Sequence, residues 1–168
     1  MNRASSQRGV AGSRPLWQRP AFVSLLLALT TAAVFYPVLG CGFINLDDPQ
    51  YVTENTHVGN GLTGPNFLWA FQATDNASWY PMTWLYFLAG TTLFGRGATG
   101  AHFVNLVLHT ANTVLVFLLL FRWTGARWRS AFVAGVFALH PLGVEAVAWV
   151  AERKGLLSAF FGLLTLWA

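Results

Sequence analysis

The sequence has 168 residues, of which 55% are hydrophobic and only 10% are charged. Soluble domains carry about 25% charged residues, so the composition excludes an ordinary soluble domain and a disordered chain and favours a membrane protein. The ten Lys and Arg side chains are scattered among apolar runs and form no continuous basic patch, so we expect no nucleic-acid partner. The single cysteine, Cys41, excludes an intrachain disulfide.

The chain opens with a basic tail at residues 1–19, which is followed by a first apolar run at residues 21–39. A helix over this run is about 28 Å long, close to the thickness of the hydrocarbon core of a bilayer, so we expect it to span a membrane. The alternative is a lipoprotein-type signal peptide that ends before Cys41. We favour the span, because Leu39 is bulky for such a cleavage site and later apolar runs make a lipid anchor redundant.

Beyond the first run, the pattern predicts an outer loop and three further spans. The loop covers about residues 40–101, and its semi-apolar stretch at 81–94 is too short to span and is typical of an interfacial helix. The aromatic residues at 79–85 suit the headgroup level, and they would equally stack on a sugar or cover a polyprenyl chain. The later spans are expected at about 102–121, 130–148 and 155–168. The last of these is short, so we interpret the chain as a fragment of a longer protein.

The distribution of charge predicts how the spans are oriented. The tail holds four arginines and the turn at 122–129 holds three, whereas the 40–101 loop holds four acids and one base, Arg96. Because cytoplasmic loops are enriched in Lys and Arg, we expect the N-terminus and this turn in the cytoplasm. Arg153 and Lys154 fall on the outer side against this rule, so they call for an acidic partner or a phosphate. The fold expected is an all-α, multi-pass membrane protein with about four transmembrane helices, placed in a bacterial inner membrane.

The first candidate for chemistry is the acidic pair Asp47 and Asp48, directly outside the first span. Two adjacent carboxylates repel each other, which tends to raise one pKa and suits a general base that acts on a hydroxyl. The alternative is a solvated Asp-Pro turn, because Asp and Pro are common turn residues. From the spacing alone, the turn is the favoured interpretation.

The second candidate is the segment 140–154. Its ionisable members are His140, Glu145, Glu152, Arg153 and Lys154. If the chain is helical after Pro141, then Glu145, Trp149 and Glu152 share one helical face. Ionisable groups at membrane depth are costly and indicate function. The alternative is the interfacial end of a helix, with Trp149 in the aromatic belt and the two cations reaching out to water.

The third candidate is a polar stripe inside the second span, formed by His102, Asn105, His109 and Asn112. Offsets of three, four and three residues keep these side chains on one helical face. Polar side chains in a span usually bond to neighbouring helices, so we interpret the stripe as packing, with His102 nearest the outer surface as the exception. A zinc site is disfavoured, because Asn is a poor zinc ligand and no third ligand is evident.

Several motifs occur together in a fixed order. They are FINLDDPQYVTEN (43–55), GLT (61–63), WYPMTW (79–84), LFG (93–95), HFVNLVLHTAN (102–112), TG (124–125) and FALHPLGVEAVAWVAERK (137–154). In this order they resemble the N-terminal membrane region of the transmembrane and tetratricopeptide-repeat proteins. That family is similar to GT-C-fold glycosyltransferases and is related to protein O-mannosyltransferases. The resemblance covers about residues 20–168, which would then form an incomplete, partial GT-C-like bundle.

The resemblance implies transfer of a sugar from a polyprenyl-phosphate donor to a protein or glycan acceptor on the outer face of the membrane. Asp47 would be the base or acceptor-orienting acid, with Asp48 as its partner. Arg153 and Lys154 would neutralise the donor phosphate. Supporting positions would be taken by His102, His140, Glu145 and Glu152. The metal is unknown; some GT-C members place a divalent ion on the first-loop acids, and oxygen ligands suit Mg or Mn.

The sequence departs from the family pattern at Gly155, where an Asp usually follows Glu-Arg-Lys. A fragment with about four spans is also not expected to close a GT-C active site by itself. Three functions remain, each with its own geometry. A glycosyltransferase region predicts that the acidic pair and the Arg-Lys pair converge in one outward cavity. A non-enzymatic scaffold predicts that they are dispersed. A transporter or channel subunit predicts that the polar stripe lines a pore.

Overall fold

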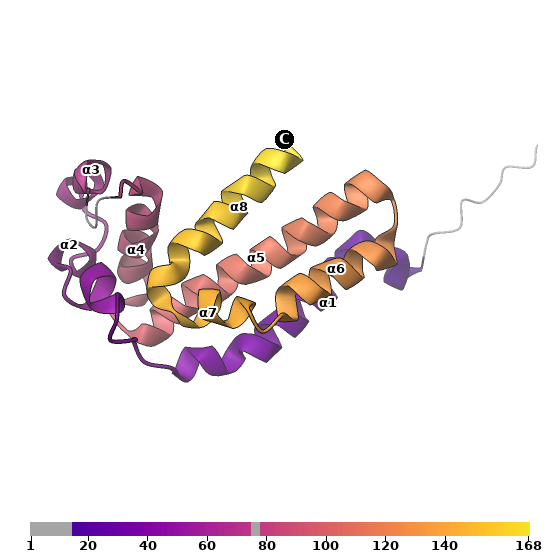
Figure 1. Cartoon of the computed structure of the whole chain (residues 1–168), viewed down its shortest axis with the longest axis horizontal. Helices are drawn as coiled ribbons and strands as arrows, with labels where there is room; N and C mark the ends of the chain where they lie inside the picture. The colour runs from indigo at the N-terminus through magenta and orange to yellow at the C-terminus, as the bar shows by residue number, and fades with distance from the viewer. Residues whose placement is uncertain (1–14, 75–77) are drawn as a thin grey trace, which may run out of the picture.

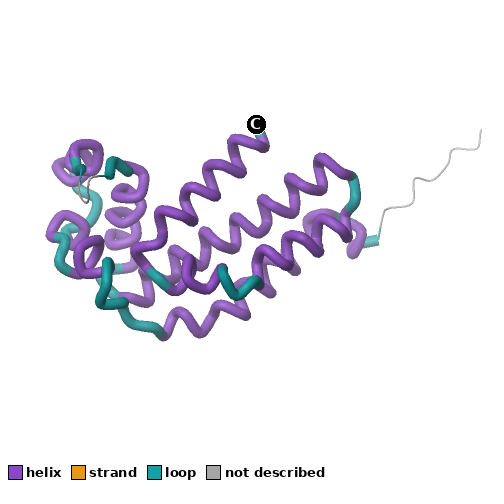
Figure 2. The backbone as a smooth tube through the Cα atoms, viewed as in Figure 1, coloured by secondary structure: helices purple, strands orange, loops and turns teal. Residues whose placement is uncertain are grey.

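The computed structural model describes residues 15–74 and 78–168, so most of the expected basic tail lies outside the described residues. Every regular element in these two ranges is a helix, and neither range contains a strand. Figure 2 shows the helices joined by loops and turns along the described chain. The expected all-α class is therefore confirmed for the described part of the protein.

The first apolar run forms helix α1 (Pro20–Phe35), which follows a short 3-10 turn, η1 (Leu16–Gln18), and tightens into the 3-10 helix η2 (Tyr36–Gly40). Pro20 stands at the first helical position, where its missing N–H costs nothing. Pro37 lacks the N–H that a continuing α-helix would use, which accounts for the tighter turn. Together α1 and η2 are long and apolar enough to cross a membrane.

The central element is α5 (Ala98–Thr124), whose 27 residues extend about 40 Å. It is the second helix of the described chain that is long and apolar enough to cross a membrane. Helices α1, α6 (Arg127–Leu139) and α8 (Arg153–Trp167) pack along it (Figure 1). Gly125 ends α5 in the left-handed conformation, with a φ of 65°, which favours glycine at this C-terminal position.

The predicted outer loop folds into a compact group of helices at one end of α5 (Figure 1). Its elements are the π-helical turn η3 (Pro49–Thr53), α2 (Thr56–Gly59), α3 (Gly64–Gln72) and α4 (Pro81–Phe94). Helix α4 has the bounds expected for the interfacial helix. The group packs around the buried side chains of Val58, Trp84, Phe87, Leu88 and Val150. Because Val150 comes from the far end of the sequence, this core joins the outer helices to the segment before α8.

The GLT motif at residues 61–63 forms the turn between α2 and α3. Gly61 has a φ of +71°, and a Cβ added there would lie 2.6 Å from Thr92 Oγ1, so the turn requires glycine. Thr63 caps α3 by accepting the N–H of Asn66. The buried Asn66 amide in turn donates to the carbonyls of His57 and Gly61.

The third apolar run, expected as one helix over 130–148, is interrupted. Helix α6 ends at Leu139, and α7 (Gly143–Ala148) begins only after Pro141. The residue before a proline avoids helical backbone, and His140 is extended with ψ at 133°. A second break follows at Trp149, which is extended between α7 and the 3-10 turn η5 (Val150–Glu152). Glu145, Trp149 and Glu152 therefore do not share one continuous helix, and that prediction is wrong.

Candidate functional site

Asp48 is completely buried and bonds two separate parts of the chain. Its Oδ2 accepts the N–H of Ile44 at 2.8 Å, and its Oδ1 accepts the N–H of Ala151, also at 2.8 Å. Both carboxylate oxygens of Asp48 thus accept a backbone N–H group. Asp48 is therefore not a solvated turn residue. It fixes the first loop to the segment that precedes Arg153.

Arg153 is also buried, with 1% of its surface exposed. Its Nε donates to Asn105 Oδ1 at 2.9 Å, its Nη2 donates to the carbonyl of Ala101 at 2.8 Å, and the guanidinium lies 4.3 Å from the centre of the Phe87 ring. The guanidinium also interacts electrostatically with Asp48. The charge of Arg153 is therefore balanced inside the protein.

Asn105 links Arg153 to the broken segment. Its Nδ2 donates to the carbonyls of Val147 at 3.4 Å and Trp149 at 3.2 Å, while its Oδ1 accepts from Arg153. The break at Trp149 frees carbonyl and N–H groups that a helix would otherwise satisfy. Asn105 and Asp48 supply the missing partners, so the break is held by side chains from α5 and from the first loop.

The buried charges lie in packed surroundings and not in a substrate-sized cavity. The space beside Arg153 is lined by Phe87, Gly90 and Arg96 and measures about 10 Å³, which is room for about one water molecule. Asp48 and Arg153 thus converge at one end of the molecule, as the transferase hypothesis requires. The transferase hypothesis predicts a wide cavity around both side chains, but the space beside Arg153 is small.

The neighbouring Asp47 and Lys154 are more accessible. Both are partly exposed, and no side-chain hydrogen bond of Asp47 occurs within the described part of the chain. Lys154 Nζ lies 3.8 Å from Glu152 Oε2 and 5.6 Å from the centre of the Tyr51 ring. The N–H of Tyr51 donates to the Asp47 carbonyl, so Tyr51 connects the turn that carries the acid with the cation. Tyr51 therefore contacts both the backbone of Asp47 and the ammonium group of Lys154.

Other aromatic residues of the first loop pack against Tyr51. Tyr51 stacks on Trp84 at 5.5 Å between ring centres, and its hydroxyl lies 2.7 Å from the Tyr80 hydroxyl. Sequence reasoning placed Tyr80 and Trp84 at the headgroup level and gave Tyr51 no role. The signal that would have identified Tyr51 is its position one turn after Asp47.

The remaining predicted site residues lie elsewhere. His102 is buried and its Nε2 bonds to the carbonyl of Gly42 at 3.3 Å, which ties α5 to the first loop. His140 is exposed at the end of α6, and its Nδ1 accepts the N–H of Leu142 at 3.3 Å. Glu145 is exposed on α7. Within the described ranges, no side-chain hydrogen bond or ion pair joins His140 or Glu145 to Asp48 or Arg153.

The polar stripe of α5 faces protein and not a pore. All four side chains are buried, and each bonds to a backbone carbonyl of another element. His109 Nε2 donates to the carbonyl of Ala138 at 3.0 Å, near the end of α6, and Asn112 Nδ2 donates to the carbonyl of Leu156 at 2.9 Å. The packing interpretation fits this geometry, and the pore-lining geometry that the transporter alternative predicts is not found.

The described residues contain no group of three or more His, Cys, Asp or Glu side chains that would hold a metal ion. Both oxygens of Asp48 are already bonded to N–H groups, so of the acidic pair only the Asp47 carboxylate is free of such bonds. The described residues therefore offer a divalent ion one carboxylate of this pair, which fits an ion whose other ligands are water or substrate oxygens.

Comparison with known proteins gives a consistent set of relatives. The chain is 30% identical over 152 residues to protein O-mannosyl-transferase Tmtc2 of Drosophila melanogaster, an alignment that covers 86% of this chain and 16% of the relative. It is 30% identical over 145 residues to protein O-mannosyl-transferase TMTC3 of Mus musculus, covering 82% of this chain and 16% of the relative. It is 36% identical over 173 residues to protein O-mannosyl-transferase TMTC4 of Homo sapiens, covering 87% and 22%.

No protein-family model matches the sequence, and no solved structure matches it significantly. The chain spans between 16% and 22% of the length of these three relatives, so it corresponds to one part of such proteins. The resemblance inferred from the ordered motifs is confirmed. Over most of its length, the chain is homologous to the protein O-mannosyl-transferases of the transmembrane and tetratricopeptide-repeat family.

Proposed function

We propose that this chain is a membrane region of a glycosyltransferase that moves a sugar from a polyprenyl-phosphate donor to a protein or glycan acceptor on the extracytoplasmic face. The observation that carries the proposal is the 2.8 Å bond from the Ala151 N–H to Asp48. It brings the acidic loop against the segment that ends in Arg153 and Lys154. The transferase names of the relatives and the two apolar helices support the same class of membrane enzyme.

The proposed topology has the N-terminus in the cytoplasm of a bacterial cell and four crossings of its inner membrane. The crossings are α1 with η2, then α5, then the broken pair α6 and α7, and finally α8. Contacts at both ends of α8 support its crossing, because Arg153 bonds to Asn105 and the Trp167 carbonyl accepts Arg122 Nη1 at 2.7 Å. Arg122 belongs to the basic turn expected in the cytoplasm, so α8 follows α5 from one side to the other. Together these helices form part of a GT-C-like bundle.

In the proposed reaction, Asp47 accepts the proton of an acceptor hydroxyl. The hydroxyl oxygen then bonds to the anomeric carbon, the bond from that carbon to the phosphate oxygen breaks, and the phosphate leaves with the electron pair. Lys154 is partly exposed and would stabilise the charge of the leaving phosphate, with Glu152 orienting it. Asp48 and Arg153 are positioning residues, because their polar atoms are bonded within the protein.

A second function, a non-enzymatic membrane scaffold, is favoured by one observation. The most buried charged groups, Asp48 and Arg153, make bonds that a purely structural cluster would make. The two functions differ in what they require of Asp47, which is partly exposed and which the structural cluster does not use.

The test is transfer of a labelled sugar from a polyprenyl-phosphate donor by the full-length protein. We expect Asp47→Asn to reduce kcat by about 100-fold or more, because loss of a general base costs rate enhancements of this order. The matched control is Glu54→Gln, which neutralises an exposed acid in the same loop and should leave the rate unchanged. Equal activity of Asp47→Asn and the unchanged protein would reject the catalytic role and favour the scaffold.

A further inference from the structure

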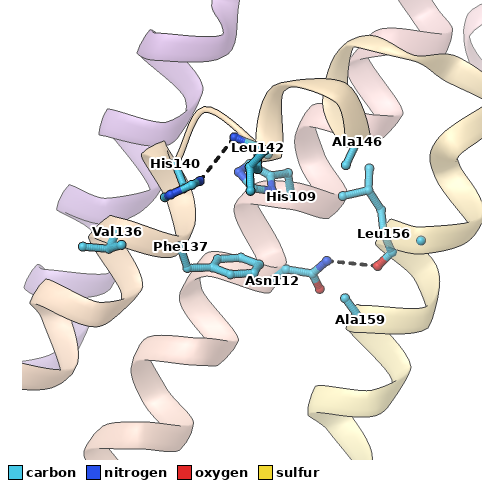
Figure 3. Close-up of a pocket in the computed structure, with 11 residues that line it drawn as sticks. His109, Asn112, Val136, Phe137, His140, Leu142, Ala146, Leu156 and Ala159 are labelled. Carbon is cyan, nitrogen blue, oxygen red and sulfur yellow. Dashed lines mark hydrogen bonds between the residues drawn. The ribbon is translucent and has the colours of Figure 1, made fainter.

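A cavity of about 420 Å³ lies among α5, α6, α7 and α8. Figure 3 shows the Asn112 amide between Phe137 of α6 and Ala159 of α8, with His140 near the turn into α7. Small-molecule sites in proteins have volumes of about 300–1,000 Å³ and walls that are mostly apolar with a few polar groups. This cavity has that size and that character.

Asn112 supplies the polar group inside the cavity. Its side chain is completely buried, and its Nδ2 donates to the Leu156 carbonyl at 2.9 Å. That bond fixes which side of the amide carries the oxygen, and Oδ1 has no hydrogen-bond partner in the part of the chain that the structure describes. A buried acceptor without a donor is costly, so this oxygen calls for a donor from a ligand.

The two histidines that line the cavity add complementary groups. His109 donates from Nε2 to the Ala138 carbonyl, which leaves Nδ1 as an acceptor in the neutral ring. His140 accepts the Leu142 N–H at Nδ1, which leaves Nε2 as a donor in its neutral ring. The lining contains no Lys or Arg, the side chains that most often bind phosphate in proteins.

We propose that this cavity binds a neutral lipid alcohol, with its apolar body against the walls and its hydroxyl donating to Asn112 Oδ1. A hydroxyl donates a hydrogen bond, so it matches the unpaired acceptor of Asn112. A lining without Lys or Arg favours a neutral head group over a phosphate at this site. The hydroxyl belongs either to a diacylglycerol or to a free prenol, and the proposal is independent of the transferase reaction.

The test is native mass spectrometry of the full protein after delipidation and reloading. The probes are dioleoylglycerol and geranylgeraniol, each beside its O-methyl ether, which keeps the body and removes the donor. We expect the alcohol to be retained about tenfold more than its ether, equivalent to about 1.4 kcal/mol, and the probe that shows this difference identifies the source. Equal retention of both alcohols and both ethers would overturn the proposal.

Two variants locate the binding in the cavity. Asn112→Ala should remove the preference for the alcohol over the ether. Ala159→Phe should block retention by filling the cavity without changing Asn112. The matched control is Ala111→Phe, which makes the same change in a separate apolar groove and should retain the alcohol. If Asn112→Ala does not fold, the comparison of Ala159→Phe with Ala111→Phe and the comparison of each alcohol with its ether still test the proposal. Retention that is unchanged by Ala159→Phe would overturn it.

Discussion

Asp47 and Asp48 are adjacent in the sequence but meet different surroundings. Asp48 points into the protein and accepts two backbone N–H groups, one of them 103 residues away along the chain. Asp47 is partly exposed, and its backbone carbonyl accepts the N–H of Tyr51, whose ring centre lies 5.6 Å from Lys154 Nζ. Asp48 therefore has a structural role, whereas Asp47 is accessible to a substrate.

At the residue scale, this division predicts unequal effects on stability. We expect Asp48→Ala to lower the free energy of unfolding by about 3–5 kcal/mol, because it leaves two N–H groups without their charged acceptor and removes the counter-charge of Arg153. Asp47→Ala should change the same free energy by less than about 1 kcal/mol. Denaturant titration in detergent micelles measures both values, and equal losses would contradict the division.

At the scale of elements, the polar stripe of α5 explains how interrupted helices pack beside it. Pro141 interrupts the helical conformation between α6 and α7, and extended backbone at Trp149 interrupts it again before α8. Asn105 and His109 bond to carbonyls at or beside these breaks, and Asn112 bonds to the Leu156 carbonyl in the first turn of α8. Irregular backbone among apolar helices is tolerated where protein groups satisfy it, and the stripe provides those groups.

This account predicts local loosening when the central member of the stripe is removed. Asn105→Ala should speed hydrogen exchange of the backbone amides in residues 149–153 by about tenfold or more, because Trp149 and Arg153 both lose a bonded partner. Hydrogen-exchange mass spectrometry on peptides from this segment measures the effect. The matched control is Thr110→Ala on the same helix, and an equal increase in that variant would count against the account.

The sequence predicts continuous apolar helices well and tertiary partners poorly. The first span and α4 have the expected bounds, because hydrophobic runs and flanking prolines define them. The break at Trp149 was missed, since no proline or glycine marks it and its stability comes from Asn105. Likewise, Asp48 resembles a turn residue until Ala151 is brought beside it. The Asp48 and Arg153 environments depend on contacts between distant segments that local pattern does not contain.

At the scale of the whole molecule, the two ends of the helical bundle carry different sets of charged residues. One end carries Arg122 and Arg127 near the turn between α5 and α6. The other end gathers Asp47, Asp48 and Lys154 around the outer helices. In the proposed topology, the acidic loop and the Arg153–Lys154 segment lie together on the side of the membrane opposite the basic turn.

The most direct test is cross-linking in right-side-out vesicles of the protein with Cys41→Ser, which removes the single native thiol. A short, membrane-impermeant bifunctional maleimide added outside should link Asp47→Cys to Lys154→Cys. The control pair Asp47→Cys and Arg129→Cys should give no link under the same conditions. Absence of a link between positions 47 and 154, or labelling of either one only after the vesicles are opened, would contradict the account.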